Sequence, residues 1–123
     1  MKDRLFLVLG SLSAGLAVVI GAFGGHILKQ RLSPEMWTVF EVGARYHFFH
    51  ALGLLAVAWA NGRWPCKWTA AAGWCLVAGT ALFSGSLYLL AMTGQSWLGA
   101  ITPVGGAVFI IGWLCLAMGV RQQ

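Results

Sequence analysis

Charge is what this sequence has least of: only 9% of its 123 residues are Asp, Glu, Lys or Arg, whereas 59% are hydrophobic. A soluble domain carries about 25% charged residues, which keep its surface hydrated. A chain of this size with so few charges cannot cover itself with polar groups. The composition therefore excludes a soluble globular domain and predicts that lipid surrounds most of the chain.

Cysteine is also scarce, and its three copies follow no disulfide or metal-binding pattern. Cys66, Cys75 and Cys115 are odd in number and none belongs to a CxxC pair. This spacing predicts neither a disulfide framework nor a zinc site, and we interpret the three thiols as packing residues. The SGS stretch at 84–86 lacks the strand–turn–helix context and the Asp that a hydrolase triad requires, so we expect no hydrolase.

The net charge of +5 does not indicate a nucleic-acid partner. Apart from Arg45, the basic residues lie at the edges of apolar runs, which is typical of membrane proteins. Phosphate binding instead needs a continuous basic stripe. The flanking basic residues are Lys2, Arg4, Lys29, Arg31, Arg63, Lys67 and Arg121.

Four apolar segments are long enough to cross a bilayer, which takes about 20 helical residues. Turn residues at 61–67 and 93–96 separate the later segments, and such short turns place consecutive helices antiparallel. The predicted fold is all-α, an up-down four-helix integral membrane bundle that forms one transmembrane domain over residues 1–123. The predicted spans are 5–25, 41–60, 68–92 and 101–120, with 34–40 as an interfacial start to the second.

The basic flanks also predict an orientation, since cytoplasmic loops carry the excess of Lys and Arg. With four spans, both termini and the 61–67 turn share one side, together with five flanking basic residues. Lys29 and Arg31 are the two on the other side. Both termini are therefore predicted to be cytoplasmic. Four tryptophans near span ends are expected to act as interfacial anchors: Trp37, Trp64, Trp68 and Trp97.

Small residues recur on one face of three spans. Cohesion between helices in lipid depends on close backbone approach, so these strips are predicted to face neighbouring helices. They are Ser13, Ala17, Gly21 and Gly25 in the first span, Ala44, Ala51 and Ala58 in the second, and Gly105, Gly112 and Gly119 in the fourth.

Two stretches that contain proline predict helix starts. Ser33 precedes Pro34, a pattern typical of an N-cap followed by the first helical position. Thr102 precedes Pro103 in the same way and is expected to cap the fourth helix, whose free N–H groups would form a weak anion seat.

Polar residues within the spans define a candidate site. At 1.5 Å per residue, seven of them fall about 24–30 Å above the cytoplasmic end, under the outer headgroups. We expect at least one of the other five to hydrogen-bond Glu41 or Arg45, because lipid offers no other partner. The seven residues of this predicted polar layer are His26, Glu41, Arg45, Ser84, Ser86, Tyr88 and Thr102.

The two remaining histidines, His47 and His50, lie on the opposite face of the second span from Glu41 and Arg45, at 100° per residue. Glu41 and Arg45 are spaced as an i, i+4 ion pair, which could be a structural clamp or a ligand or proton site. His47 and His50 with His26 could hold a metal or haem, but His26 sits about 10 Å higher by the helix count. We interpret the histidines as structural and predict no metal site and no cofactor.

Four stretches carry a family resemblance: GAFGGH (21–26), ARYHFFHALGLLA (44–56), GTALFSGSLYLLA (79–91) and ITPVGGAVFIIGW (101–113). They resemble the YgdD-like small membrane proteins, a domain of unknown function with eukaryotic relatives. The resemblance implies a multi-pass protein of the bacterial inner membrane with four helices, and it carries no activity. It departs at Gly25, where alanine is expected. The matching positions are His26, Tyr46, His50, Ser84, Gly85, Ser86, Tyr88, Thr102, Pro103 and Gly105.

These patterns favour a non-enzymatic role. The leading hypothesis is an accessory, assembly or interaction subunit in the lipid bilayer that docks against a membrane-protein partner or forms a homo-oligomer. The first alternative is an oligomeric permease for small solutes, ions or protons, gated by His26, Glu41, Arg45 and Tyr88. The second is a haem or metal redox membrane protein built on the histidines.

Overall fold

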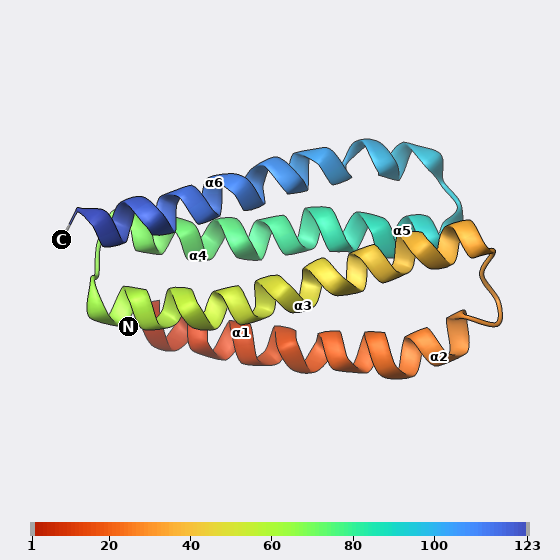
Figure 1. The fold of residues 1–123 in the computed structure, drawn as a ribbon, viewed down its shortest axis with the longest axis horizontal. Helices are drawn as coiled ribbons and strands as arrows, with labels where there is room; N and C mark the ends of the chain where they lie inside the picture. The colour runs from red at the N-terminus through yellow and green to blue at the C-terminus, as the bar shows by residue number, and fades with distance from the viewer. Residues whose placement is uncertain (1, 123) are drawn as a thin grey trace.

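A computed structural model describes residues 2–122, and every regular element in that range is helical. The predicted all-α class is confirmed. The chain folds into four long rods joined by short connections (Figure 1). The first rod consists of α1 (Lys2–Val18), the π-helix η1 (Val19–Gly24) and α2 (Gly25–Leu28), and the second is α3 (Pro34–Arg63). The third consists of α4 (Lys67–Gly79), the π-helix η2 (Thr80–Ser84) and α5 (Gly85–Thr93). The fourth consists of the 3-10 helix η3 (Ser96–Ala100) and α6 (Thr102–Arg121).

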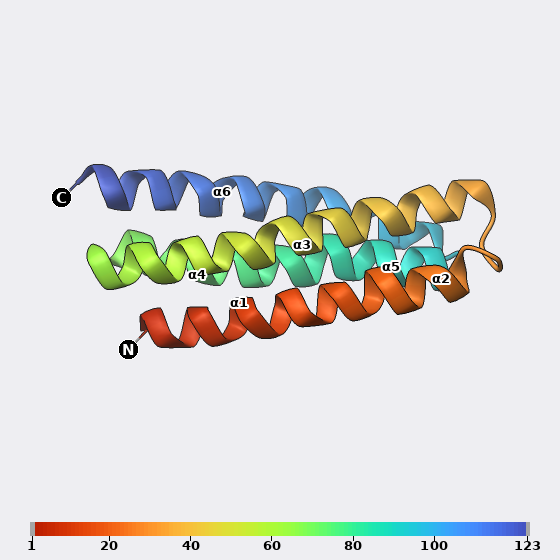
Figure 2. The ribbon, with the colours of Figure 1, turned by 60° about the horizontal axis from the view of Figure 1, so that its bottom comes forward.

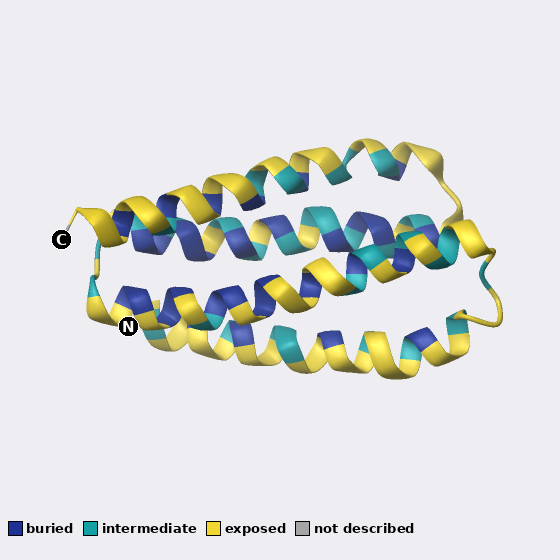
Figure 3. Ribbon diagram, in the orientation of Figure 1, coloured by how far each residue is buried: buried dark blue, intermediate teal, exposed yellow. Residues whose placement is uncertain are grey.

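The rods alternate in direction and lie side by side. In Figures 1 and 2, α1 and α6 lie on opposite sides, with α3 and the α4–α5 rod between them. The packing agrees, since α1 contacts chiefly α3, and α6 contacts chiefly α4 and η2. The outer surfaces of α1 and α6 are largely exposed, while buried residues gather where the rods face one another (Figure 3).

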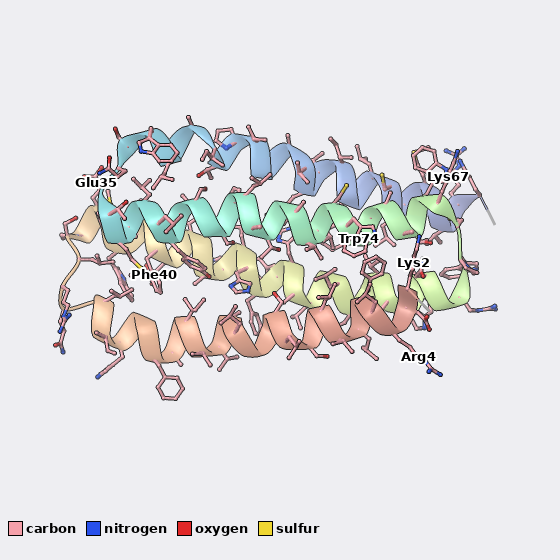
Figure 4. The ribbon with its side chains drawn as sticks, turned by 180° about the vertical axis from the view of Figure 1, so that it is seen from behind. Lys2, Arg4, Glu35, Phe40, Lys67 and Trp74 are labelled. Atoms are coloured by element: carbon pink, nitrogen blue, oxygen red, sulfur yellow. The ribbon has the colours of Figure 1, made fainter. Side chains whose placement is uncertain are left out.

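The two ends of the bundle differ in charge. The N-terminus, the C-terminus and the α3–α4 connection lie at one end (Figure 1), and Lys2, Arg4 and Lys67 appear there in Figure 4, with Glu35 at the opposite end. Basic side chains also lie over tryptophan rings near the helix ends, with Lys67 Nζ 5.3 Å from the ring centre of Trp68. Trp37, Trp64 and Trp68 thus each have a basic side chain over the ring, and their role as interfacial anchors stays a prediction.

The predicted starts of α3 and α6 are both confirmed, since α6 begins at Thr102 with Pro103 in its first turn, but the prediction that Thr102 caps α6 was wrong. Ser33 is the N-cap of α3, and its hydroxyl accepts a hydrogen bond from the Met36 N–H at 3.2 Å. Before α6 the chain already winds as η3, Ile101 occupies the cap position, and no side chain caps it. The Thr102 hydroxyl instead lies 2.6 Å from that of Ser86.

Glycines of α6 allow the closest helix approach, as predicted. Gly105, Gly112 and Gly119 are buried, and a Cβ added to any of them would press on the third rod, at Phe83, Cys75 and Thr69 respectively. Small residues thus permit the backbone contact that holds helices together in lipid.

The predicted strip of the first span is only partly correct. Ala17 and Gly25 are buried, but Gly21 is exposed, and a Cβ there would meet no atom within 4 Å. Gly21 lies within η1, which has no buried residue, whereas Ala17 before it and Gly25 after it both face the bundle. The close approach to α3 occurs instead at Gly10, where a Cβ would lie 3.1 Å from the Ala51 carbonyl oxygen.

Three rods are long and apolar enough to cross a membrane: Lys2–Leu28, Lys67–Thr93 and Ser96–Arg121. The rod α3 is longer, at 30 residues, but it carries Glu41, Arg45 and two histidines and is not among these three. Hydropathy thus identifies a helical membrane protein with three candidate spans.

Candidate functional site

A buried histidine connects three of the four rods. The side chain of His47 on α3 is only 4% exposed. Its Nδ1 lies 2.9 Å from the hydroxyl of Tyr88 on α5, and its Nε2 lies 3.0 Å from the hydroxyl of Ser13 on α1. We call Ser13, His47 and Tyr88 the His47 cluster. Both ring nitrogens are engaged, so the cluster positions α1 and α5 relative to α3.

The α3 backbone next to the cluster is shaped to receive the third rod. Gly43 has no side chain, and a Cβ there would lie 3.1 Å from the Tyr88 ring. The Ser84 hydroxyl, at the end of η2, donates a 2.7 Å hydrogen bond to the Gly43 carbonyl. Tyr88 and Ser84 therefore approach α3 on the same side, one through its ring and the other through its hydroxyl.

A cavity of about 430 Å³ lies beside the His47 cluster, between α1 and the third rod. All three cluster side chains line it, and its walls are otherwise mostly aliphatic. Exposed residues such as Leu12, Leu16 and Ala81 lie at its margin, so it opens on the outside of the bundle. None of its lining residues is Asp, Glu, Lys or Arg. The site is therefore a neutral, apolar groove with a hydrogen-bonding patch.

Both π-helices contribute to this cavity, with Ile20 from η1 and Thr80, Ala81 and Ser84 from η2. Single π-helical turns within α-helices occur frequently at functional sites. The cavity is the one place in the described structure where an open volume, a buried polar cluster and helix irregularities coincide. We take it as the candidate functional site.

His50 forms a separate, closed arrangement. Its Nδ1–H donates to the Tyr46 carbonyl at 2.7 Å, and its Nε2 accepts from the Trp113 indole N–H at 3.1 Å. Because a carbonyl only accepts and an indole only donates, these partners fix one neutral tautomer. The ring also stacks on Phe109 at 3.5 Å between ring centres. Both nitrogens are occupied, so His50 joins α3 to α6.

The predicted polar layer is divided by the structure. Ser84 and Ser86 are buried and Tyr88 and Thr102 half-buried, whereas His26, Glu41 and Arg45 are exposed. Within residues 2–122, no hydrogen bond or ion pair joins Glu41 or Arg45 to any of the other five, so that prediction was wrong. The physical reason is the rotation of α3, which turns Phe40, Gly43 and His47 inward and leaves Glu41 and Arg45 outside.

The three histidines do not converge. His26 is exposed on α2, while both ring nitrogens of His47 and of His50 hydrogen-bond other protein groups. In the described part of the chain, no three His, Cys, Asp or Glu side chains are grouped as metal ligands would be. The geometry thus gives the haem or metal alternative no set of free ligands.

Sequence reasoning missed Ser13 as a polar participant and counted it only as a small residue. Ser11 and Ser13 are the only hydroxyl residues between Leu5 and Val19, and that isolation was the available signal. It also missed Asn61 and Thr69, two buried residues that hydrogen-bond each other at 3.0 Å near the α3–α4 connection.

Residues 20–106 match the profile of a family described as a protein of unknown function (DUF423). The chain is 45% identical to the UPF0382 membrane protein YwdK of Bacillus subtilis over 116 residues, 94% of either chain. It is also 45% identical to the UPF0382 membrane protein SSP2132 of Staphylococcus saprophyticus over 118 residues, 94% of this chain and 96% of that one. No solved structure matches. The predicted family resemblance is confirmed.

Proposed function

Because the chain belongs to the DUF423 family of membrane proteins, whose function is unknown, we propose a role from its own geometry. The protein is a non-enzymatic accessory or interaction subunit that docks within the bilayer against another membrane protein or a second copy of itself. The docking surface is the exposed side of the first rod around Gly15.

The observation that carries this proposal is the set of three uncovered glycines on the first rod. A Cβ at Gly15, Gly21 or Gly24 would meet no atom within 4 Å, so nothing inside the bundle requires glycine there. Glycine in a helix costs about 1 kcal/mol relative to alanine, and in lipid such positions let a second helix approach closely. The first rod is also the least covered of the three candidate spans, with 17% of its most apolar window buried, against 33% and 22%.

We further propose that all four rods span the bacterial inner membrane and that both termini are cytoplasmic. The α3 rod is as long as its neighbours, and its polarity is partly internal, since His47 and His50 are turned into the bundle. Five flanking basic residues at the end with the termini, against two at the other, support this orientation.

A permease has weaker support. Of its four proposed gating residues, only Tyr88 lies in the interior, and Glu41, Arg45 and His26 are exposed. The cavity beside Tyr88 also lacks charged lining residues.

The docking proposal is tested with Gly15→Leu. The larger side chain has room on this chain but would block a helix that packs against Gly15. We expect the wild type, extracted from its own membrane in mild detergent or native lipid discs, to elute as a complex, and Gly15→Leu to elute as a monomer. The matched control is Gly85→Leu, another helical glycine with no atom within 4 Å of its Cβ position, on the third rod. It should behave as wild type. A monodisperse wild-type monomer in native lipid would contradict the proposal.

A further inference from the structure

The His47 cluster has more N–H and O–H donors than it makes hydrogen bonds. A neutral imidazole supplies one N–H, and the two hydroxyls supply one O–H each, which makes three donors. The cluster makes two hydrogen bonds, His47 to Tyr88 and His47 to Ser13. No other acceptor within residues 2–122 is bonded to the Ser13 or the Tyr88 hydroxyl.

In either neutral tautomer of His47, one hydroxyl O–H of the cluster therefore donates to no acceptor. If Nδ1 carries the proton, it donates to Tyr88, Ser13 donates to Nε2, and the Tyr88 O–H is unused. If Nε2 carries it, the Ser13 O–H is unused instead. A doubly protonated ring would free both hydroxyl protons. In every state the cluster therefore presents at least one O–H donor.

That donor belongs to the cavity wall, since Ser13 and Tyr88 both line it. A hydrocarbon surrounding has no acceptor to offer, and an unsatisfied polar group there costs free energy. The cavity volume of about 430 Å³ lies within the range of about 300–1,000 Å³ typical of small-molecule sites. Its lining has aliphatic walls and no charged side chain that would pair with a phosphate or a carboxylate.

The geometry points to a binding site for a neutral, single-tailed lipid whose carbonyl oxygen accepts the spare hydroxyl proton of the His47 cluster while its tail lies along the apolar groove. The open margin at Leu12, Leu16 and Ala81 lets such a molecule enter sideways from the bilayer. The absence of charged lining residues selects a neutral head over a phospholipid head group.

Two photoactivatable probes test this site in the full-length protein, reconstituted in phosphatidylglycerol and phosphatidylethanolamine vesicles. One is a long-chain methyl ester with a diazirine in mid-chain, and the other is the matching alkane without oxygen. Labelled peptides are mapped by mass spectrometry. We expect the ester to label the peptides around Ser13 and Tyr88 in preference to other lipid-facing peptides, despite the excess of phospholipid.

Removing both hydroxyls, with Ser13→Ala and Tyr88→Phe together, should lower ester labelling there by about three- to tenfold, the effect of one lost hydrogen bond. Alkane labelling should not change. Filling the cavity with Gly85→Leu should lower labelling by both probes while leaving the His47 cluster intact, because Gly85 lines the cavity and has free space at its Cβ position. Gly15→Leu, outside the cavity lining, should change neither probe.

Equal ester labelling in the wild type and the double variant would overturn the inference, as would labelling spread evenly over the lipid-facing surface. If the double variant does not fold, by circular dichroism and gel filtration, Gly85→Leu decides: undiminished ester labelling in that variant overturns the site. If phospholipid suppresses the ester labelling of the wild type, a phospholipid chain occupies the groove, and that result would overturn the neutral ligand. Failure of the docking proposal is distinguishable, because its readout is the oligomeric state of the Gly15→Leu protein, whereas Gly85→Leu is read here by probe labelling.

Discussion

Buried polar side chains in this bundle are held in small, separate groups. In the described part of the chain, no buried side-chain nitrogen or oxygen lacks a hydrogen-bond partner. The most connected hydroxyl is that of Thr69, which is fully buried where α3 meets α4. It accepts from the Asn61 side chain at 3.0 Å and from the Cys66 N–H at 3.2 Å, and carbonyls of Trp64 and Cys66 lie within hydrogen-bonding distance. One side chain thus closes the connection between two rods.

Replacing this hydroxyl should destabilise the protein markedly. Thr69→Val keeps the shape but leaves two donors, Asn61 Nδ2 and Cys66 N–H, without their acceptor, at a cost of about 1–3 kcal/mol for each buried group left unsatisfied. The measurement is the unfolding midpoint in detergent micelles, followed by circular dichroism. Thr93→Val is the control, because that hydroxyl is exposed, donates to its own helix at Leu89, and accepts only from the N–H of the exposed Gln95, which water can replace. Equal midpoints for the two variants would contradict the role of Thr69.

At the scale of the elements, helices meet where an aromatic ring of one rod lies on a glycine of another. Phe6 of α1 is fully buried and reaches across to Gly73 of α4, where an added Cβ would collide with its ring. Phe109 of α6 packs against Gly79 in the same manner. Such pairs add a side-chain contact between α1 and α4 and a second one between α6 and α4.

Gly73→Ala is therefore expected to lower the unfolding midpoint, because overpacking a close contact costs about 1–3 kcal/mol. Gly15→Ala should leave the midpoint unchanged or raise it, since no atom lies near that Cβ position and alanine favours the helix. Phe6→Leu combined with Gly73→Ala should recover part of the loss. A Gly73→Ala protein as stable as Gly15→Ala would show that the Phe6 contact is not a constraint.

For the whole molecule, orientation in the membrane is the property that the basic flanks predict. The α3–α4 connection and both termini lie at one end of the bundle, and Cys66 lies in that connection, half-exposed (Figure 1). The Thr69 backbone N–H, at the start of α4, hydrogen-bonds the Cys66 thiolate and lowers the pKa of that thiol. A lowered pKa means that more thiolate is present at neutral pH, and the thiolate is the form that reacts. Cys66 is thus a native reporter of topology.

In a Cys75→Ala, Cys115→Ala background, a membrane-impermeant maleimide should leave Cys66 unlabelled in intact spheroplasts and label it once the membrane is opened. Labelling should persist to lower pH than that of a free cysteine peptide, because the thiolate is lost only below the lowered pKa. A Cys introduced at Gln30, in the connection at the opposite end, is the control and should label from outside. Labelling of Cys66 in intact spheroplasts would reverse the proposed orientation.

The sequence alone determined the solvent, the class and the positions of the helices. The few charges and long apolar runs predict a lipid environment. The turn residues at 61–67 fix where the second helix ends and the third begins. The strip of Gly105, Gly112 and Gly119 also identified a contact face correctly, because a uniform α-helix keeps residues seven apart on one side.

The tertiary structure alone decided which face of α3 lies inside. Helical spacing fixes the angle between Glu41 and His47, and the sequence separated them correctly, but it does not fix the rotation of the whole rod. That rotation depends on what the neighbouring rods present, namely Ser13 from α1 and Tyr88 from α5. On the third rod, the π-helix η2 lies directly before α5 and changes the angular spacing between Tyr88 and the residues of α4. Because three rods must meet to form the His47 cluster and its cavity, no single helix pattern could reveal them.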